Sequence, residues 1–345
     1  MDFNFSIYTS LTLESLELPP SNVFPAFIFG TLTYCAILVF NMTVLLTIAL
    51  NRKLHKPMYV LLFNLPISDM VGASAFFPQL VSSILSQNRS ITYSACFVQA
   101  LLVHLCGTGA ILTLSAMAYD RYIAICCPLK YNTLMSPNNL LKIIIMIWIL
   151  DFTLIGSLLA LNYRKEICST KIVDIFCNNP SLMKLVCGDT KLNNYYGLFL
   201  TAFFEGLSLL IVVFTYIQIL ITVVVKRQSD AKSKAIQTCG THLIVFLCFQ
   251  FTAVFAFIAH RIDAASPSLR RAFGASAIIF PPIINPLIYG LKTKEVRQTF
   301  IFFFHKTFFP TKQNKLSGMK MAKDSEDFNV ALRFDRESTG GIFVT

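Results

Sequence analysis

Seven long apolar stretches dominate this chain and restrict it to one class of fold. A helix needs about 20 mostly apolar residues to cross a bilayer, and each stretch reaches that length. Only 14% of the residues are charged, whereas a soluble domain carries about 25%. We therefore expect an all-α membrane protein, a seven-transmembrane helix bundle, rather than a soluble enzyme. The expected spans are residues 24–50, 57–85, 96–127, 139–161, 195–225, 234–260 and 270–291.

The distribution of basic residues predicts the orientation of this bundle. The net charge of +11 could suggest nucleic acid, but lysine and arginine lie mostly next to the apolar spans. There they set the topology and contact anionic membrane lipid, so no nucleic-acid partner is expected. The basic segments 51–56 and 226–234 are expected inside, and the acidic segment 1–23 outside. The predicted location is the plasma membrane, with multiple crossings and an extracellular N-terminus.

The chain is expected to have four parts. Residues 1–23 form an extracellular N-terminus, and residues 24–291 form the bundle. Residues 292–306 mix basic side chains with phenylalanines, which predicts a short amphipathic helix on the inner leaflet. Residues 307–345 are polar and are expected to form a disordered cytoplasmic tail.

Two sequons and four cysteines fall in segments that are predicted to be extracellular. Asn4 and Asn88 each begin an Asn-X-Ser sequence and are candidate glycosylation sites. The extracellular side is oxidising, so disulfides are expected, but four cysteines allow three pairings and spacing cannot choose among them. The loop cysteines lack zinc-type CxxC spacing, no HExxH motif occurs, and neither an enzyme nor a cofactor is expected. The four cysteines are Cys96, Cys168, Cys177 and Cys187.

Three acidic residues lie inside predicted spans, where an ionisable group needs a partner or water. Asp69 is either a protonated structural acid or part of an ion site. Asp151 has no partner that the sequence can name. Glu205 is a satisfied interior acid, a site for a cationic ligand, or a partner of His104.

Two prolines are expected to disturb predicted helices, because proline has no N–H to donate. Pro66 lies within the second span and can kink it. Pro286 lies within the seventh span and frees a backbone carbonyl. Asn285 can satisfy freed backbone groups there, and the kink is a candidate hinge.

The third span ends in an acid, a base and a phenol in a row. The mostly apolar residues 111–118 precede Asp120, Arg121 and Tyr122. Asp120 and Arg121 can pair with each other, and Arg121 can pass to a new partner if the bundle opens. The group is therefore either a conformational switch or a charge cluster that caps the helix at the lipid headgroups.

Four segments resemble signatures of one membrane receptor family. They read PMYVLLFNLPISD from Pro57, MAYDRYIAIC from Met117, KAIQTCGTHL from Lys234 and PPIINPLIYGL from Pro281. These segments resemble those of the olfactory (odorant) receptors, a rhodopsin-like G-protein-coupled receptor family. The segment from Lys234 is the most specific of the four, and the resemblance extends over residues 57–297.

The resemblance implies pairings that spacing leaves open. It pairs Cys96 with Cys177 and Cys168 with Cys187. It also makes Asp69 a candidate position for a sodium ion, although Ala110 replaces the glutamate that many family members add.

The chain departs from the family at two further positions. Pro66 stands where serine is usual, and Gln250 stands where the family has tyrosine.

The resemblance further implies a small-molecule odorant as ligand, bound between the outer halves of spans three, five, six and seven. Val103 stands where amine receptors carry an aspartate, which argues against a biogenic amine held at that position. The implied ligand-binding residues are His104, Gly107, Thr108, Ile111, Ala202, Glu205, Gln250, Phe251, Val254, Phe257, Ala275 and Ile278.

The resemblance also implies coupling to a heterotrimeric G protein of the stimulatory olfactory type, which raises cyclic AMP. The switch and coupling residues are Asp120, Arg121, Tyr122, Tyr216, Lys234, His242, Asn285, Pro286 and Tyr289. The alternative is a rhodopsin-like receptor for another ligand class, a peptide or a lipid. A transporter or channel is disfavoured because no inverted repeat is evident.

Overall fold

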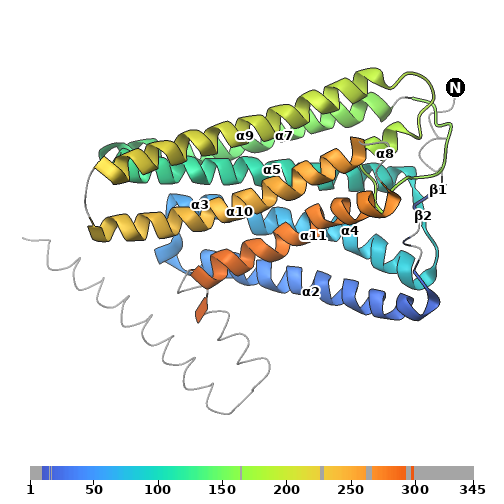
Figure 1. The fold of residues 1–345 in the computed structure, drawn as a ribbon, viewed down its shortest axis with the longest axis horizontal. Helices are drawn as coiled ribbons and strands as arrows, with labels where there is room; N and C mark the ends of the chain where they lie inside the picture. Colours follow the sequence, from blue (N-terminus) through green and yellow to red (C-terminus); the bar gives the residue numbers. More distant parts are fainter. Residues whose placement is uncertain are drawn as a thin grey trace, which may run out of the picture. The chain divides into compact units, whose positions relative to one another are not determined.

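The computed structural model describes residues 10–14, 16, 18–163, 165–225, 229–261, 266–292 and 297–298. Within these residues, seven helical spans are long and apolar enough to cross a membrane (Figure 1). The predicted fold class, an all-α bundle of seven spans, is therefore confirmed. The bundle helices are α2 (Pro20–Leu50), α3 (Pro57–Leu62) with α4 (Asn64–Ser86), α5 (Tyr93–Cys126), α7 (Pro137–Tyr163), α9 (Lys191–Val225), α10 (Ser229–Arg261) and α11 (Pro267–Lys292).

Most helices begin a few residues before the predicted spans, because capping groups start them in the polar layer that hydropathy leaves out. The side chain of Thr92 accepts a hydrogen bond from the N–H of Ala95 and caps α5. Pro20 occupies the first position of α2, where its fixed φ suits a helix and no N–H is needed. The predicted amphipathic helix and tail lie outside the described residues, except for Lys292, Arg297 and Gln298.

The second span is divided at Phe63, where α3 ends and α4 begins. Pro66 cannot donate to the carbonyl of Leu62, so the hydrogen-bond ladder is interrupted one turn before the proline. The side chain of Asn64 donates to the carbonyls of Val60 and Leu61, both at 3.2 Å. These bonds satisfy two carbonyls on the N-terminal side of the break.

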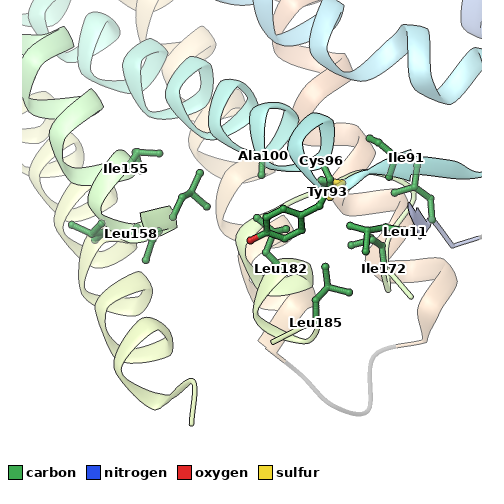
Figure 2. Close-up of a cluster of buried hydrophobic side chains, with 14 of the residues drawn as sticks. Leu11, Ile91, Tyr93, Cys96, Ala100, Ile155, Leu158, Ile172, Leu182 and Leu185 are labelled. Atoms are coloured by element: carbon green, nitrogen blue, oxygen red, sulfur yellow. A yellow bond between two sulfur atoms is a disulfide. The ribbon is translucent and has the colours of Figure 1, made fainter. Parts of the chain in front are cut away.

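A small cap of extended chain covers one end of the bundle. Strand β1 (Ser10–Thr12) pairs antiparallel with β2 (Ser90–Thr92), and Leu11 lies opposite Ile91. Figure 2 shows Leu11 packed into a buried cluster with Tyr93, Ile172 and neighbouring side chains. The N-terminal segment and two loops therefore lie at the same end, which also carries the short helix α8 (Asn179–Met183).

Two disulfides hold this end together. Cys96 at the top of α5 is bonded to Cys177, and Cys168 is bonded to Cys187. These are the pairings that the family resemblance implies. Gln99 supports the first of them, because its side chain accepts from the N–H of Cys177 at 2.7 Å.

Helix α5 is the central element of the bundle. It packs against α4, α7, α9 and α10, and it runs from the disulfide at Cys96 to the charged triplet at Asp120. The remaining short elements lie at the opposite end from the cap. They are η1 (Arg52–Leu54), η2 (Pro128–Lys130) and α6 (Tyr131–Leu134).

Candidate functional site

A cavity of about 250 Å³ lies between α5, α7, α9, α10 and α11 and is bounded by the loop around Asn178. Its wall is mainly apolar, with Phe176, Phe204 and Phe249 among the lining side chains. This composition is typical of small-molecule sites in helix bundles. The cavity lies in the same half of the bundle as the disulfide-bonded cap.

Seven of the residues predicted to contact a ligand line this cavity. They come from four helices that are distant in the sequence. The seven are His104, Gly107, Thr108, Ile111, Glu205, Phe257 and Ile278.

Five predicted residues, Ala202, Gln250, Phe251, Val254 and Ala275, do not line the cavity. Phe251 is 60% exposed on the outside of the bundle, and Ala202 is also exposed. Successive residues of a helix are rotated by about 100°. A shift of one residue in the predicted alignment therefore assigns a different side of the helix to the cavity. The neighbours Thr201, Phe204, Phe249, Thr252, Ala253, Gly274 and Ala277 line the cavity instead.

The ligand-binding residues predicted from the sequence did not include one wall of the cavity, which is formed by α7 and the long loop between α7 and α9. Ile155 and Leu158 contribute from α7, and Phe176, Asn178 and Asn179 contribute from the loop. Phe176 precedes Cys177, so the disulfide to Cys96 draws it over the cavity. The position of Phe176 next to Cys177 is the one sequence feature that could have indicated its place at the cavity.

Glu205 brings the one acidic side chain to this cavity among the described residues. Its Oε2 atom is buried and has no hydrogen-bond partner in the described part of the chain. The side-chain amide of Gln250 lies 3.4 Å from the Glu205 carbonyl, and Gln250 Oε1 is likewise buried without a partner there. His104 uses Nδ1 to bond the carbonyl of Ala100 at 2.8 Å.

Asp151 has a partner that the sequence did not reveal. This fully buried carboxyl on α7 is hydrogen-bonded to the hydroxyl of Thr108, a cavity-lining residue of α5. The close approach depends on Gly109, since a Cβ there would lie 3.0 Å from the Trp148 ring and 3.1 Å from Asp151. Trp148 in turn donates to Asn64 at 3.2 Å.

An ion pair and hydrogen bonds tie the loop above the cavity to α11. The buried carboxyl of Asp174 accepts from Arg270 at 3.1 Å and from Asn178 and Ser181 at 2.9 and 2.8 Å. Arg270 also donates to the carbonyl of Val173 at 2.8 Å. These contacts hold the polar residue Asn178 at the cavity wall.

Below the cavity, Asn285 of α11 donates to Asp69 of α4 at 3.0 Å. Asp69 and Ser68 line a second space of about 40 Å³, and Ser68 Oγ is buried without a partner among the described residues. No group of three His, Cys, Asp or Glu residues that could hold a metal occurs in the described chain, and sodium at Asp69 stays a prediction.

The carbonyl freed by Pro286 is satisfied differently from the expectation. Pro286 leaves the carbonyl of Pro282 without its helical donor. The side chain of Asn41, fully buried on α2, donates to that carbonyl at 2.9 Å. Asn285 instead binds Asp69, so the proposed role of Asn285 at the kink is corrected.

Two residues of the triplet, Asp120 and Arg121, form a closed cluster with Tyr131 at the end of α5 opposite the disulfide-bonded cap. Arg121 donates to Asp120 at 2.6 Å, and the hydroxyl of Tyr131 donates to the other carboxylate oxygen at 2.9 Å. Burial, followed by the charge of Asp120, raises the pKa of Tyr131 to about 12. Tyr122 lies apart from this cluster and packs against Phe214. The sequence did not indicate Tyr131, because it lies eleven positions after Asp120 and beyond the end of α5.

A second polar contact joins α9 to α10 at the same end. The hydroxyl of Tyr216 donates to the carbonyl of Cys239 at 2.7 Å and lies 3.1 Å from His242 Nδ1. His242 Nε2 and the Tyr289 hydroxyl are buried without partners among the described residues. Lys234 lies on α10, but its side chain is outside the described part of the structure.

Comparison with known proteins identifies the family. Residues 30–306 match the sequence profile of the olfactory receptors. The chain belongs to the olfactory receptor family. Human olfactory receptor 52J3 is 33% identical to this olfactory receptor over 307 residues, which cover 88% of this chain and 98% of the relative. Human olfactory receptor 52K2 is 34% identical over 272 residues, which cover 78% and 87%, and mouse olfactory receptor 6E1 is 31% identical over 271 residues, which cover 78% and 86%.

The fold of this olfactory receptor is also that of squid rhodopsin. The two structures align with a TM-score of 0.69 and 16% identity over 87% of this chain and 90% of the rhodopsin. At that identity the likeness concerns the fold alone. This olfactory receptor is therefore a multi-pass membrane protein of the G-protein-coupled class, and its family consists of receptors rather than enzymes.

Proposed function

We propose that this chain is an odorant receptor that binds a small molecule in the cavity and activates a stimulatory olfactory-type G protein, raising cyclic AMP. One observation carries the proposal. Helix α5 supplies cavity-lining residues from Val103 to Ile111 and, about 15 Å further along its axis, the ion pair of Asp120 and Arg121. Ligand contact and switch are thus parts of one rigid element.

The ligand acts by favouring one arrangement of the bundle over another, since equal binding to both would signal nothing. In the arrangement described here, Asp120 holds Arg121, and Tyr216 bonds the carbonyl of Cys239. Activation separates Arg121 from Asp120 and moves the inner ends of α9 and α10 apart. The G-protein α subunit then binds the inner face, which includes Arg121, Lys234, His242 and Tyr289.

The proposed ligand site comprises the seven cavity residues named from the sequence, together with Phe176, Thr201, Phe204, Phe249 and Thr252. The receptor lies in the plasma membrane with its N-terminus and the disulfide-bonded cap outside. Asn88 is exposed at this end and is a proposed glycosylation site. Asn4 lies outside the described residues.

A cyclic AMP assay in cells that express the receptor and the olfactory G protein tests this function. A broad panel of volatile and water-soluble compounds is applied to wild type, to Arg121→Ala, and to Arg52→Ala as a control at an exposed arginine of the inner loop. At equal surface expression, the response is expected to disappear in Arg121→Ala and persist in Arg52→Ala. A response that survives Arg121→Ala would refute the switch, and a silent, well-expressed wild type would refute the odorant function.

A further inference from the structure

Hydrogen-bond acceptors without donors are in excess beside the cavity, at the interface of α9 and α10. Glu205 Oε2 and Gln250 Oε1 are both buried and both lack partners within the described residues. The side chain of Gln250 lies beside Glu205, because Gln250 Nε2 is 3.4 Å from the backbone carbonyl of Glu205. No lysine or arginine occurs among the cavity-lining residues that the structure describes.

The hydroxyl groups of the cavity do not offset this excess. Thr201 and Thr252 donate to the backbone carbonyls of Gly197 and Phe249, both at 2.9 Å. The hydroxyl hydrogen of Thr108 is directed at either the carbonyl of His104, at 2.8 Å, or the carboxyl of Asp151. A hydroxyl carries a single hydrogen, so each of these three groups has only lone pairs left for a ligand. His104 Nδ1 also bonds a carbonyl, which means that this nitrogen carries a proton that is already used.

A ligand that fits such a wall must bring its own donors. An ammonium group has three donors and no acceptor, and its bond to a carboxylate is charge-assisted. A carboxylate or ketone would instead place a further acceptor against Glu205. The cavity volume of about 250 Å³ lies near the lower end of the range of about 300–1,000 Å³ that is typical of ligand pockets, which favours a small ligand.

We infer that the ligand is a small alkyl amine whose ammonium group binds Glu205 and whose hydrocarbon part lies against Phe204 and Phe249. The inference rests on the proposed function and specifies its ligand class. The site differs from the position of Val103, which is apolar and lies on α5. Gln250, a departure from the family, does not line the cavity, but its side chain adds a second unpaired acceptor next to Glu205.

Thermal unfolding of the purified full-length receptor tests this inference without a G protein, because a ligand that binds the folded state raises Tm. The probes are hexylamine, hexanol and hexanoic acid, which share one alkyl chain length. Hexylamine is expected to raise Tm most. Glu205→Gln is expected to weaken its apparent affinity by about 10- to 100-fold, whereas Glu205→Asp retains part of it. Glu166→Gln, the same change at an exposed loop residue, should leave it unaltered.

Two results would overturn the inference. One is stabilisation by hexanol or hexanoic acid that equals or exceeds that by hexylamine in wild type, a comparison that needs no variant to fold. The other is unchanged hexylamine affinity in Glu205→Gln, as expected if an internal cation already neutralises the carboxylate. Binding of hexylamine without a cyclic AMP response would leave the ligand class standing and refute the signalling function instead.

Discussion

Replacing Asn41 by leucine tests how the bundle tolerates the proline in α11. Asn41 is fully buried and donates to the carbonyl of Pro282 at 2.9 Å. Leucine has a similar size but no donor, so Asn41→Leu leaves that carbonyl without a partner. Its second contact, to the carbonyl of Ile37, matters less because that group lies in regular helix.

Two general values bound the expected loss of stability in Asn41→Leu. An orphaned buried polar group costs about 1–3 kcal/mol, whereas hydrogen bonds between membrane helices average about 0.6 kcal/mol. We expect Asn41→Leu to lower the free energy of unfolding by about 1–2 kcal/mol. At about 2–4 °C per kcal/mol, Tm should fall by about 2–8 °C in a thermal-unfolding assay of the purified receptor.

Pro286→Ala provides the decisive second variant. Alanine restores the N–H that a regular helix directs to the carbonyl of Pro282. In the Pro286→Ala background, Asn41→Leu should therefore cost much less than it does in wild type. An equal fall in Tm in both backgrounds would refute the reasoning, because it would show that Asn41 stabilises the bundle by packing rather than by satisfying this carbonyl.

Two other positions give direct tests. Gly109→Ala places a Cβ about 3 Å from Trp148 and should lower the free energy of unfolding by about 1–3 kcal/mol. The control Gly156→Ala places its Cβ in open space and should have little effect. Equal Tm values for the two variants would contradict the close packing of α5 and α7. The pKa of Tyr131 is raised from 10.0 to about 12, so its contribution to stability is present below pH 10 and is lost as pH rises through 12. Tyr131→Phe should reduce that loss in unfolding scans across this range, and identical profiles would argue against the bond to Asp120.

Much of the fold could be predicted because lipid imposes a simple requirement on sequence. Each span must be long and apolar, so the number and order of helices followed from the pattern of hydropathy along the chain. The motif around Arg121 and the segment from Lys234 indicated the family because each is a continuous run of residues, which can be recognised without knowing the fold. The ion pair of Asp120 and Arg121 is likewise a contact between sequence neighbours.

What only the tertiary structure decided was which side of each helix faces which neighbour. The part of α10 that can cross the membrane, His242–Ala259, is strongly apolar on average. Hydropathy therefore could not distinguish Phe251, which lies outside, from Thr252, which lines the cavity. The partners of Asp151 and Pro282 come from other helices, at Thr108 and Asn41. A membrane helix satisfies the hydrogen bonds of its own backbone, whatever its neighbours are. Side-chain contacts between helices depend instead on how each helix is rotated about its axis and how deep it lies in the membrane, and the pattern of apolar residues along the chain does not encode either.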